Sequence, residues 1–212
     1  SGILNPAAVA PNPLAVQNAQ NYRFEPTGFT GGGQIGCNYQ TGNFVFGIEG
    51  DIDYLGLRSS RAVTLPFPGG GTFSITDSMS TDWMATVRPR VGYAANNWLF
   101  YATAGLAVTE LRFSHAYADI FNTFQNAGIN ETRYGWTAGV GVEVAIGGGP
   151  WSAKLEYLHA DFGSASVTGQ FFTVPGGPFN LFTNHSVDLR TDIVRAGLNY
   201  RFGGGTPVVA KY

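Results

Sequence analysis

The sequence has little of what defines soluble, secreted or nucleic-acid-binding proteins. Its one cysteine, Cys37, excludes an internal disulfide framework and any zinc site built on paired cysteines. Charged residues make up only 12% of the 212 residues, and the net charge of −2 provides no basic surface for nucleic acid. This low charge, with 14% aromatic residues and 30 glycines, favours a chain that exposes much of its surface to lipid.

The sequence also lacks the long apolar run of a membrane-spanning helix. The longest candidate, Trp98–Val108, is too short and contains Thr103 and Gly105. If the chain crosses a bilayer, it must therefore do so with strands. The first residues lack a basic segment followed by an apolar one, so we expect that any secretion signal lies upstream of Ser1 and has been removed.

What the sequence does have is alternation of apolar and polar residues. In Phe44–Leu57, one face of an extended strand carries Phe44, Phe46, Ile48, Ile52 and Tyr54, and the other carries Val45, Gly47, Glu49, Asp51 and Asp53. Similar alternation predicts seven strands: Phe29–Gln40, Phe44–Leu57, Thr81–Tyr93, Trp98–Phe113, Tyr134–Ile146, Trp151–Phe162 and Val187–Phe202. Strands of about 9–11 residues with an apolar outer face suit a membrane barrel. We predict an all-β, up-and-down, antiparallel transmembrane β-barrel of the eight-stranded type.

The connections between the expected strands alternate in length. Short turns at 41–43, 94–97 and 147–150 alternate with long loops at 59–78, 114–132 and 163–186. Such barrels have short periplasmic turns and long external loops. Aromatic residues gather at the strand ends as an interfacial girdle requires: Tyr39, Phe44, Tyr93, Trp98, Trp151 and Phe202 at one rim, and Trp83, Tyr134 and Trp136 at the other. We expect an exposed loop or tail over 1–27, the barrel over 28–202, and a periplasmic C-terminal tail over 203–212.

The faces expected to point into the barrel carry balanced charge. The five acids are Glu49, Asp51, Asp53, Glu143 and Glu156, and the five bases are Arg88, Arg90, Lys154, Arg195 and Arg201. The lumen of an eight-stranded barrel is only wide enough for side chains to fill. Because a broken buried ion pair costs about 3–5 kcal/mol, these charges must pair. We therefore expect a lumen plugged by a charge network.

The predicted external loops are rich in aromatic residues for segments exposed to solvent. They contain Phe67, Phe73, Phe121, Phe124, Phe171, Phe172, Phe179 and Phe182. These side chains either fold over the mouth of the barrel or form a contact surface. We favour a contact surface for lipopolysaccharide or another protein.

The chain resembles a family of small outer-membrane β-barrels of Gram-negative bacteria that includes opacity-type and outer-membrane immunogenic proteins. The similar segments are GGGQIGCNYQTGNFVFGIEGDI (31–52), VRPRVGYA (87–94), LFYATAGLAV (99–108), GWTAGVGVEVAI (135–146), KLEYLHADFGS (154–164) and VRAGLNYRF (194–202). The resemblance implies a porin-like barrel in the outer membrane, with loops outside the cell and the C-terminus in the periplasm. It also implies a non-enzymatic surface protein without a cofactor.

Two departures from this family pattern affect the prediction. The family barrel has eight strands, whereas this sequence shows seven, so the first strand is expected to be missing. We expect a separate strand or an upstream fragment to complete the barrel, and direct pairing of the first and last strands would refute this. The family chain commonly ends at the aromatic residue of its last strand, whereas here Phe202 is followed by GGGTPVVAKY. That tail is too short to be another spanning strand, and we expect either a solvated end or a periplasmic segment that binds a protein partner.

Three rival functions stay open from the sequence. One is a narrow pore. A second is a haem-binding or other ligand-binding surface protein that uses His115, His159 and His185, because some members of the resembled family are described as haemin-binding. The third is a lipid-modifying enzyme that uses His159 with Ser164 and Asp161. Since the alternation points His159 toward lipid or the interface, we do not expect catalysis.

Overall fold

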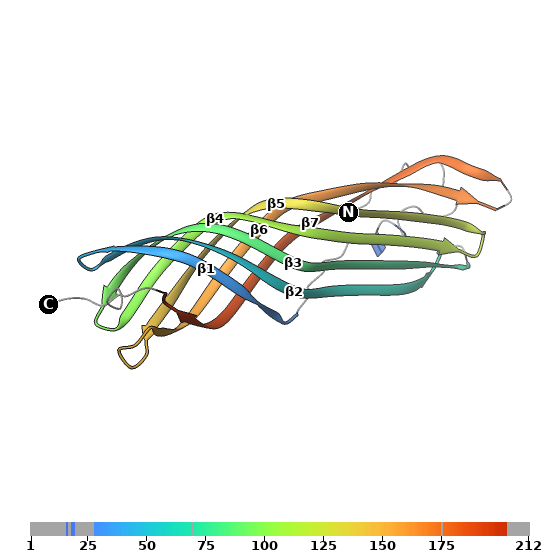
Figure 1. Ribbon diagram of the computed structural model, residues 1–212. Coiled ribbons are helices and arrows are strands. Elements are labelled where there is room, and N and C mark those ends of the chain that lie inside the picture. Colours follow the sequence, from blue (N-terminus) through green and yellow to red (C-terminus); the bar gives the residue numbers. More distant parts are fainter. Residues whose placement is uncertain (1–15, 17, 20–27, 69, 175, 203–212) are drawn as a thin grey trace.

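The computed structural model describes residues 16, 18–19, 28–68, 70–174 and 176–202, and for 177–182 it describes the backbone only. These residues form one antiparallel sheet of seven strands in chain order (Figure 1). The strands are β1 (Thr30–Thr41), β2 (Phe44–Pro66), β3 (Thr72–Ala95), β4 (Trp98–Asp119), β5 (Thr123–Ala145), β6 (Trp151–Thr173) and β7 (Gly177–Tyr200). The predicted all-β, antiparallel fold is thus confirmed. The described residues include no helix long and apolar enough to cross a membrane.

The three predicted long loops are wrong, because those segments are strand. Strands β2 to β7 each run for 22–24 residues, and only residues 67–71, 120–122 and 174–176 connect them at the far end. Pairing between β2 and β3 continues out to Pro66 and Thr72. The alternation persists there, but its outward residues are Ser and Thr, as in Thr72–Ser80 of β3. Each predicted loop is therefore the outer half of a β-hairpin.

We call the half of the sheet next to the short turns the inner half (residues 83–93 on β3) and the half next to the far hairpin ends the outer half (residues 72–80 on β3). Irregularities in strand register mark the level where these two halves meet. β2 and β3 shift between Tyr54 and Leu57, β3 and β4 between Ser80 and Met84, and β6 and β7 between Asp161 and Ser164. In the last shift Gly163 has a φ of +70°, and its backbone N–H donates to Asp161 Oδ1 at 2.8 Å. Some bulges place one residue in this left-handed conformation, which glycine adopts without strain.

The sheet curls toward a barrel but does not close. β1 pairs only with β2, and β7 only with β6, among the described strands. Side chains nevertheless touch across the seam, where Gln34 Nε2 donates to Asn199 Oδ1 at 2.7 Å. Direct pairing of the first and last strands, which would have refuted the missing-strand prediction, is not seen. Both edge strands run in the same direction, since consecutive strands are antiparallel.

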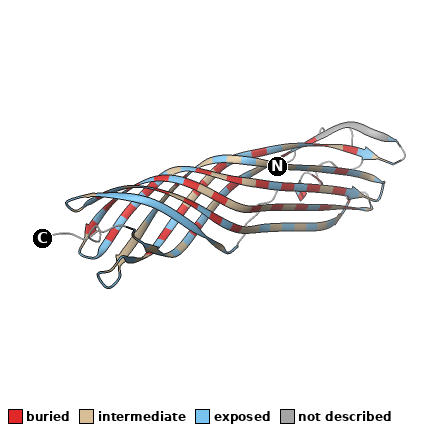
Figure 2. Ribbon diagram, in the orientation of Figure 1, coloured by how far each residue is buried: buried red, intermediate tan, exposed pale blue. Residues whose placement is uncertain are grey.

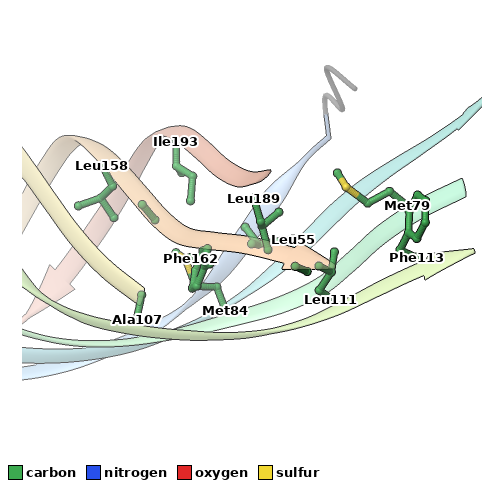
Figure 3. Close-up of a cluster of buried hydrophobic side chains, with 12 residues drawn as sticks. Leu55, Met79, Met84, Ala107, Leu111, Phe113, Leu158, Phe162, Leu189 and Ile193 are labelled. Atoms are coloured by element: carbon green, nitrogen blue, oxygen red, sulfur yellow. The ribbon is translucent and has the colours of Figure 1, made fainter. Parts of the chain in front are cut away.

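Burial alternates along nearly every strand, as the red and blue segments of Figure 2 show. Along the inward face of β3, an apolar cluster with Ala94 comes first, and the charged residues Arg90 and Arg88 follow. A second apolar cluster with Met84 and Met79 comes next, and a third with Ile75 and Phe73 fills the far end. Figure 3 shows the second cluster, to which β2, β4, β6 and β7 also contribute. The interior is therefore layered.

The amino-terminal segment was expected to be an exposed loop or tail, and this is wrong for two of its residues. Val16 and Ala19 are buried in the third cluster, with Phe67 and Tyr117. The guanidinium of Arg61 donates to the carbonyl of Ala19 at 2.9 Å. The rest of 1–27 and all of 203–212 lie outside the described residues, so both tail predictions are otherwise untested.

Candidate functional site: an apolar outer band around an ionic lumen

The outward residues of the inner half of the sheet form a band without charge. Large apolar side chains there are strongly exposed, as with Leu106 (74%) and Val194 (69%). Others in this band are Phe46, Ile48, Ile52, Val87, Val91, Phe100, Val140, Leu155 and Leu198. On β2 to β5, no described residue that points outward between the two aromatic rims is charged. In water so large an apolar patch would cause aggregation, whereas in a bilayer it is the stable arrangement.

Aromatic residues border this band on both sides. Near the short turns, rings pack in pairs: Phe44 on Tyr93 and Trp151 on Tyr200, with centroids 5.7 and 5.0 Å apart. The opposite border carries Tyr54, Trp83, Tyr134 and Trp136. Trp83 and Tyr93 are ten residue steps apart along β3, and at about 3.3 Å a step and a tilt of about 40° these span roughly 25 Å. That height matches the apolar band of outer-membrane barrels.

Charged residues appear on the outer face directly beyond the second aromatic border. On β2 to β4 they are Arg58, Asp82, Glu110 and Arg112, which form ion pairs with one another. On β6 and β7 the charges begin at the border itself: Asp161 lies beside Trp136 in the register and pairs with Arg190, and His159 pairs with Asp192. This ring of charge fixes one edge of the band, because charged groups at that level require water or headgroups.

The inward residues of the same strands form a network of ion pairs centred on two arginines. Arg88 is fully buried, and its Nη2 lies 2.7 Å from Asp51 Oδ2 and 2.9 Å from Glu49 Oε1. Arg195 reaches Asp53 at 2.5 Å, Glu156 at 2.7 Å and Asp51 at 3.2 Å. The network thus joins β2, β3, β6 and β7 through shared carboxylates.

The remaining predicted lumen residues extend this network. Arg90 lies 3.5 Å from both Glu49 and Glu143, and Lys154 lies 3.6 Å from Glu156. Two of the carboxylates also accept hydrogen bonds from hydroxyl groups: Tyr101 donates to Glu156 at 2.9 Å and Thr86 donates to Asp51 at 2.8 Å. Lys154 also donates to Gln34 on β1. Nine of the ten predicted residues therefore meet in one place.

Arg201 is the tenth predicted lumen residue, and it follows the end of β7. Its backbone N–H donates to the carbonyl of Pro150 at 2.9 Å.

Apolar layers also enter the lumen, and these were not predicted from the sequence. Their residues, such as Leu55, Met84 and Leu158, have the inward parity of their strands. That parity was the signal that could have revealed them.

The phenylalanines of the predicted contact surface divide into two groups. Phe67, Phe73 and Phe171 are buried in the third apolar cluster, so the expected contact role is wrong for these three. Phe121, Phe124 and Phe172 are exposed near the hairpin ends, and the rings of the last two stack 5.7 Å apart. The side chains of Phe179 and Phe182 lie outside the described residues.

The three histidines do not form one site. His115 and His185 are buried in the outer half with their ring centroids 4.0 Å apart, and His115 Nδ1 lies 2.6 Å from Asp77 Oδ1. Burial and the neighbouring His115 lower the pKa of His185 to about 4. His159 lies on the outer face, 2.8 Å from Asp192. No group of three or more His, Cys, Asp or Glu side chains that could hold a metal occurs in the described part of the chain.

The residues of the possible hydrolase triad are also divided. His159 Nδ1 contacts Asp192, whereas the Ser164 hydroxyl donates to Asp188 at 2.7 Å. Asp161 instead forms an ion pair with Arg190. A triad needs the serine bonded to the histidine and the histidine to the acid. The described contacts give each member a different partner.

The antiparallel strands carry an apolar band on the outside, as tall as the hydrocarbon layer of a membrane, and an ionic network on the inside. This combination defines the wall of an outer-membrane β-barrel. Residues 12–202 match the family model described as "Outer membrane protein beta-barrel domain", and the chain belongs to this family. The resemblance seen in the sequence is thereby confirmed.

Curated relatives agree with this assignment. The chain is 31% identical to the 31 kDa outer-membrane immunogenic protein of Brucella melitensis, over 82% of this chain and 67% of the relative. It is 33% identical to the 22 kDa outer membrane protein of Rhizobium leguminosarum bv. viciae, over 63% of this chain and 53% of the relative. No solved structure matches the chain significantly. The protein is therefore a surface protein of the bacterial outer membrane.

Proposed function

We propose that this protein is a non-enzymatic anchor whose plugged barrel displays three long β-hairpins outside the cell. The observation that carries the proposal is the network around Arg88 and Arg195, which lies between two apolar layers of the interior. Ions that crossed would have to displace both apolar layers and break paired charges. A closed lumen leaves the external hairpins as the part that meets other molecules.

Single-channel recording in planar bilayers tests the plugged lumen against the rival narrow pore. Purified, folded protein should give no stepwise conductance under conditions in which a general porin gives clear steps. The heat-dependent shift in gel mobility that folded barrels show would verify insertion of a folded protein. Steady conductance that rises with salt concentration would contradict the plug.

The proposal that the protein is not an enzyme is supported by the contacts of His159, Ser164 and Asp161, each of which has a different partner and none of which pairs with another in the described contacts. The printed names of the relatives also describe outer-membrane and immunogenic proteins and mention no activity. Cells that carry the His159→Ala variant should show the same lipid A acylation pattern by mass spectrometry as cells with the parent protein. A lost acyl chain in the variant would support the rival enzyme.

The orientation of the barrel is supported by the difference between its ends. The connections at 42–43, 96–97 and 146–150 are short, as periplasmic turns are, whereas the hairpins extend well beyond the apolar band. In a Cys37→Ala background, Phe121→Cys should react with a membrane-impermeant maleimide on intact cells. Gly149→Cys should react only after lysis. The reverse pattern would place the hairpins in the periplasm.

The open seam supports an additional strand between β1 and β7. In the hydrocarbon each unpaired backbone group costs several kcal/mol, so two free edges are not stable there. A single strand antiparallel to both edges restores alternating directions around the whole barrel, because β1 and β7 run the same way. We propose that a separate strand or an upstream fragment fills this position.

The contact between Gln34 and Asn199 provides the test of the seam. An inserted strand separates β1 from β7 by about 10 Å, beyond the roughly 7 Å that a disulfide can bridge. In a Cys37→Ala background, the pair Gln34→Cys and Asn199→Cys should therefore remain reduced in native membranes under mild oxidation. Mass spectrometry of the intact purified material should also reveal the strand. Rapid formation of that disulfide, with no second species, would contradict the proposal.

A further inference from the structure

Two exposed arginines flank a row of serines just beyond the apolar band. In the strand register, Arg58 of β2 lies beside Ser80 of β3, and Ser80 lies beside Arg112 of β4. The side chains of Arg58 and Arg112 are 71% and 50% exposed. They border a hollow of about 460 Å³ that is also lined by Ser60, Ser78, Ser80 and Asp82.

The height of this hollow places it at the level of lipid headgroups. Ser80 precedes the border residue Trp83 by three positions on β3. Three residues of a tilted strand raise it by roughly 8 Å above that border. The headgroup region on each side of a bilayer is roughly 5–8 Å thick. Both guanidinium groups thus lie on the lipid-facing side of the wall, above the position of the acyl chains.

One carboxylate holds the two cations side by side. Asp82 Oδ1 lies 3.3 Å from Arg58 Nη2, and Asp82 Oδ2 lies 2.9 Å from Arg112 Nη1. Arg112 Nη2 also pairs with Glu110 at 2.9 Å. A guanidinium has five N–H donors, so these ion pairs use only part of each group. Together the four side chains are neutral, so a phosphate would be held by the N–H donors that these ion pairs leave available.

We propose that this hollow binds a phosphate group of the lipopolysaccharide that forms the outer leaflet. Guanidinium groups bind phosphate oxygens with paired, charge-assisted hydrogen bonds, and the serine hydroxyls add neutral donors. The apolar band directly below accommodates the acyl chains of the same lipid, which a free phosphate would not use. The lipid assignment depends on the proposed external orientation of the hairpins.

Arg190 provides a matched control within the same chain. It lies on the outer face of β7, its side chain is 64% exposed, and it pairs with Asp161 at 3.0 Å. It therefore has similar exposure and an acidic partner, but it contributes only one guanidinium. Removing it changes the net charge of the protein by the same amount as removing Arg58 or Arg112 alone.

The test compares lipid binding by folded protein in detergent micelles, with bisphosphorylated lipid A as the probe. The Arg58→Ala/Arg112→Ala double variant should bind at least about tenfold more weakly than the parent, because it loses the charge-assisted hydrogen bonds of both guanidinium groups to the phosphate. Arg190→Ala should stay within about twofold of the parent by the same reasoning. Lipid A stripped of its phosphates should bind the parent and the double variant equally.

Three outcomes would overturn the proposal: unchanged affinity in the double variant, equal loss with dephosphorylated lipid, or competition by millimolar inorganic phosphate as effective as that by lipid A. Both arginines are exposed, so the variants should retain the gel-mobility shift of the folded barrel. The cysteine-labelling experiment distinguishes a failure of the proposed orientation from a failure of the proposed phosphate site. If the hairpins proved periplasmic while phosphate-dependent binding persisted in micelles, the orientation would fail and the site would stand.

Discussion

The inner and outer halves of the same strands carry opposite patterns. On β3, residues 83–93 turn Val87 and Val91 outward and Arg88 and Arg90 inward. Residues 72–80 turn serine and threonine outward and Phe73 and Ile75 inward. The change occurs where the register shifts near Tyr54 and Ser80. One continuous strand is therefore surrounded by lipid around residues 83–93 and by water around residues 72–80.

This comparison shows that the solvent around each half determines which residue types point into its interior. In the inner half the outward positions must be apolar, so polar residues are left for the lumen, where they pair. In the outer half, water solvates the outward serines and threonines, and the hydrophobic effect drives aromatic residues such as Phe73 inward. We therefore expect comparable substitutions in the two halves to change stability by very different amounts.

The largest effect should come from breaking the ionic lumen. Arg88→Ala leaves Glu49 and Asp51 buried without their main cation, which should destabilise the inner half by about 3–5 kcal/mol. Arg58→Ala removes an arginine from the outer face and should cost less than about 1 kcal/mol. Urea unfolding in lipid vesicles, followed by tryptophan fluorescence, measures both. Equal costs would refute the distinction between lumen and surface charge.

A charge added to the outer face should have a depth-dependent effect. Val140→Arg places a guanidinium near the middle of the apolar band and should cost about 2–4 kcal/mol. Asn126→Arg, on the exposed outer face of β5, should change stability by less than about 0.5 kcal/mol. The same unfolding experiment tests the pair. If both variants were equally stable, the inner half would be surrounded by water.

The outer half alone should respond to mild acid. The pKa of His185 is lowered to about 4 in the folded protein, below its ordinary value of 6.5. The unfolded chain then binds more protons between these values, so stability is complete above pH 6.5 and falls as the pH drops toward 4. The loss should reach at most about 3 kcal/mol.

Hydrogen exchange between pH 7 and 4.5, corrected for intrinsic rates, measures this loss. Amides of β4 and β7 in the outer half should lose protection, whereas amides of the inner half should keep it. His185→Gln should remove the response, and the surface control His159→Gln should retain it. A response shared by both halves would show that another group is titrating.

The sequence predicted the inner half well because its alternation has a high contrast. In Phe44–Leu57 every charged residue falls on the predicted inward face, and the structure pairs these carboxylates with Arg88 and Arg195. The outer half was missed because Ser and Thr resemble loop residues when their regular spacing is ignored. The stretch over 72–80 has a period of two, with its polarity reversed.

Contacts between distant strands could not be predicted from local pattern. The rings of His115 and His185 meet although they belong to β4 and β7, and the small residues Ala127 and Gly169 lie on the strands between them. Such meetings depend on the curvature of the whole sheet. The burial of Val16 in the far cluster has the same origin. Neither contact leaves a signal in the spacing of residues.

Spin-label accessibility tests the central claim most directly, with single cysteines placed in a Cys37→Ala background. A label at Val140, on the outer face of the inner half, should be accessible to oxygen dissolved in lipid and protected from a water-soluble nickel complex. A label at Asn126 should show the reverse, and one at the buried Thr137 should be protected from both. Access of the nickel complex to Val140, with oxygen excluded from it, would contradict the account.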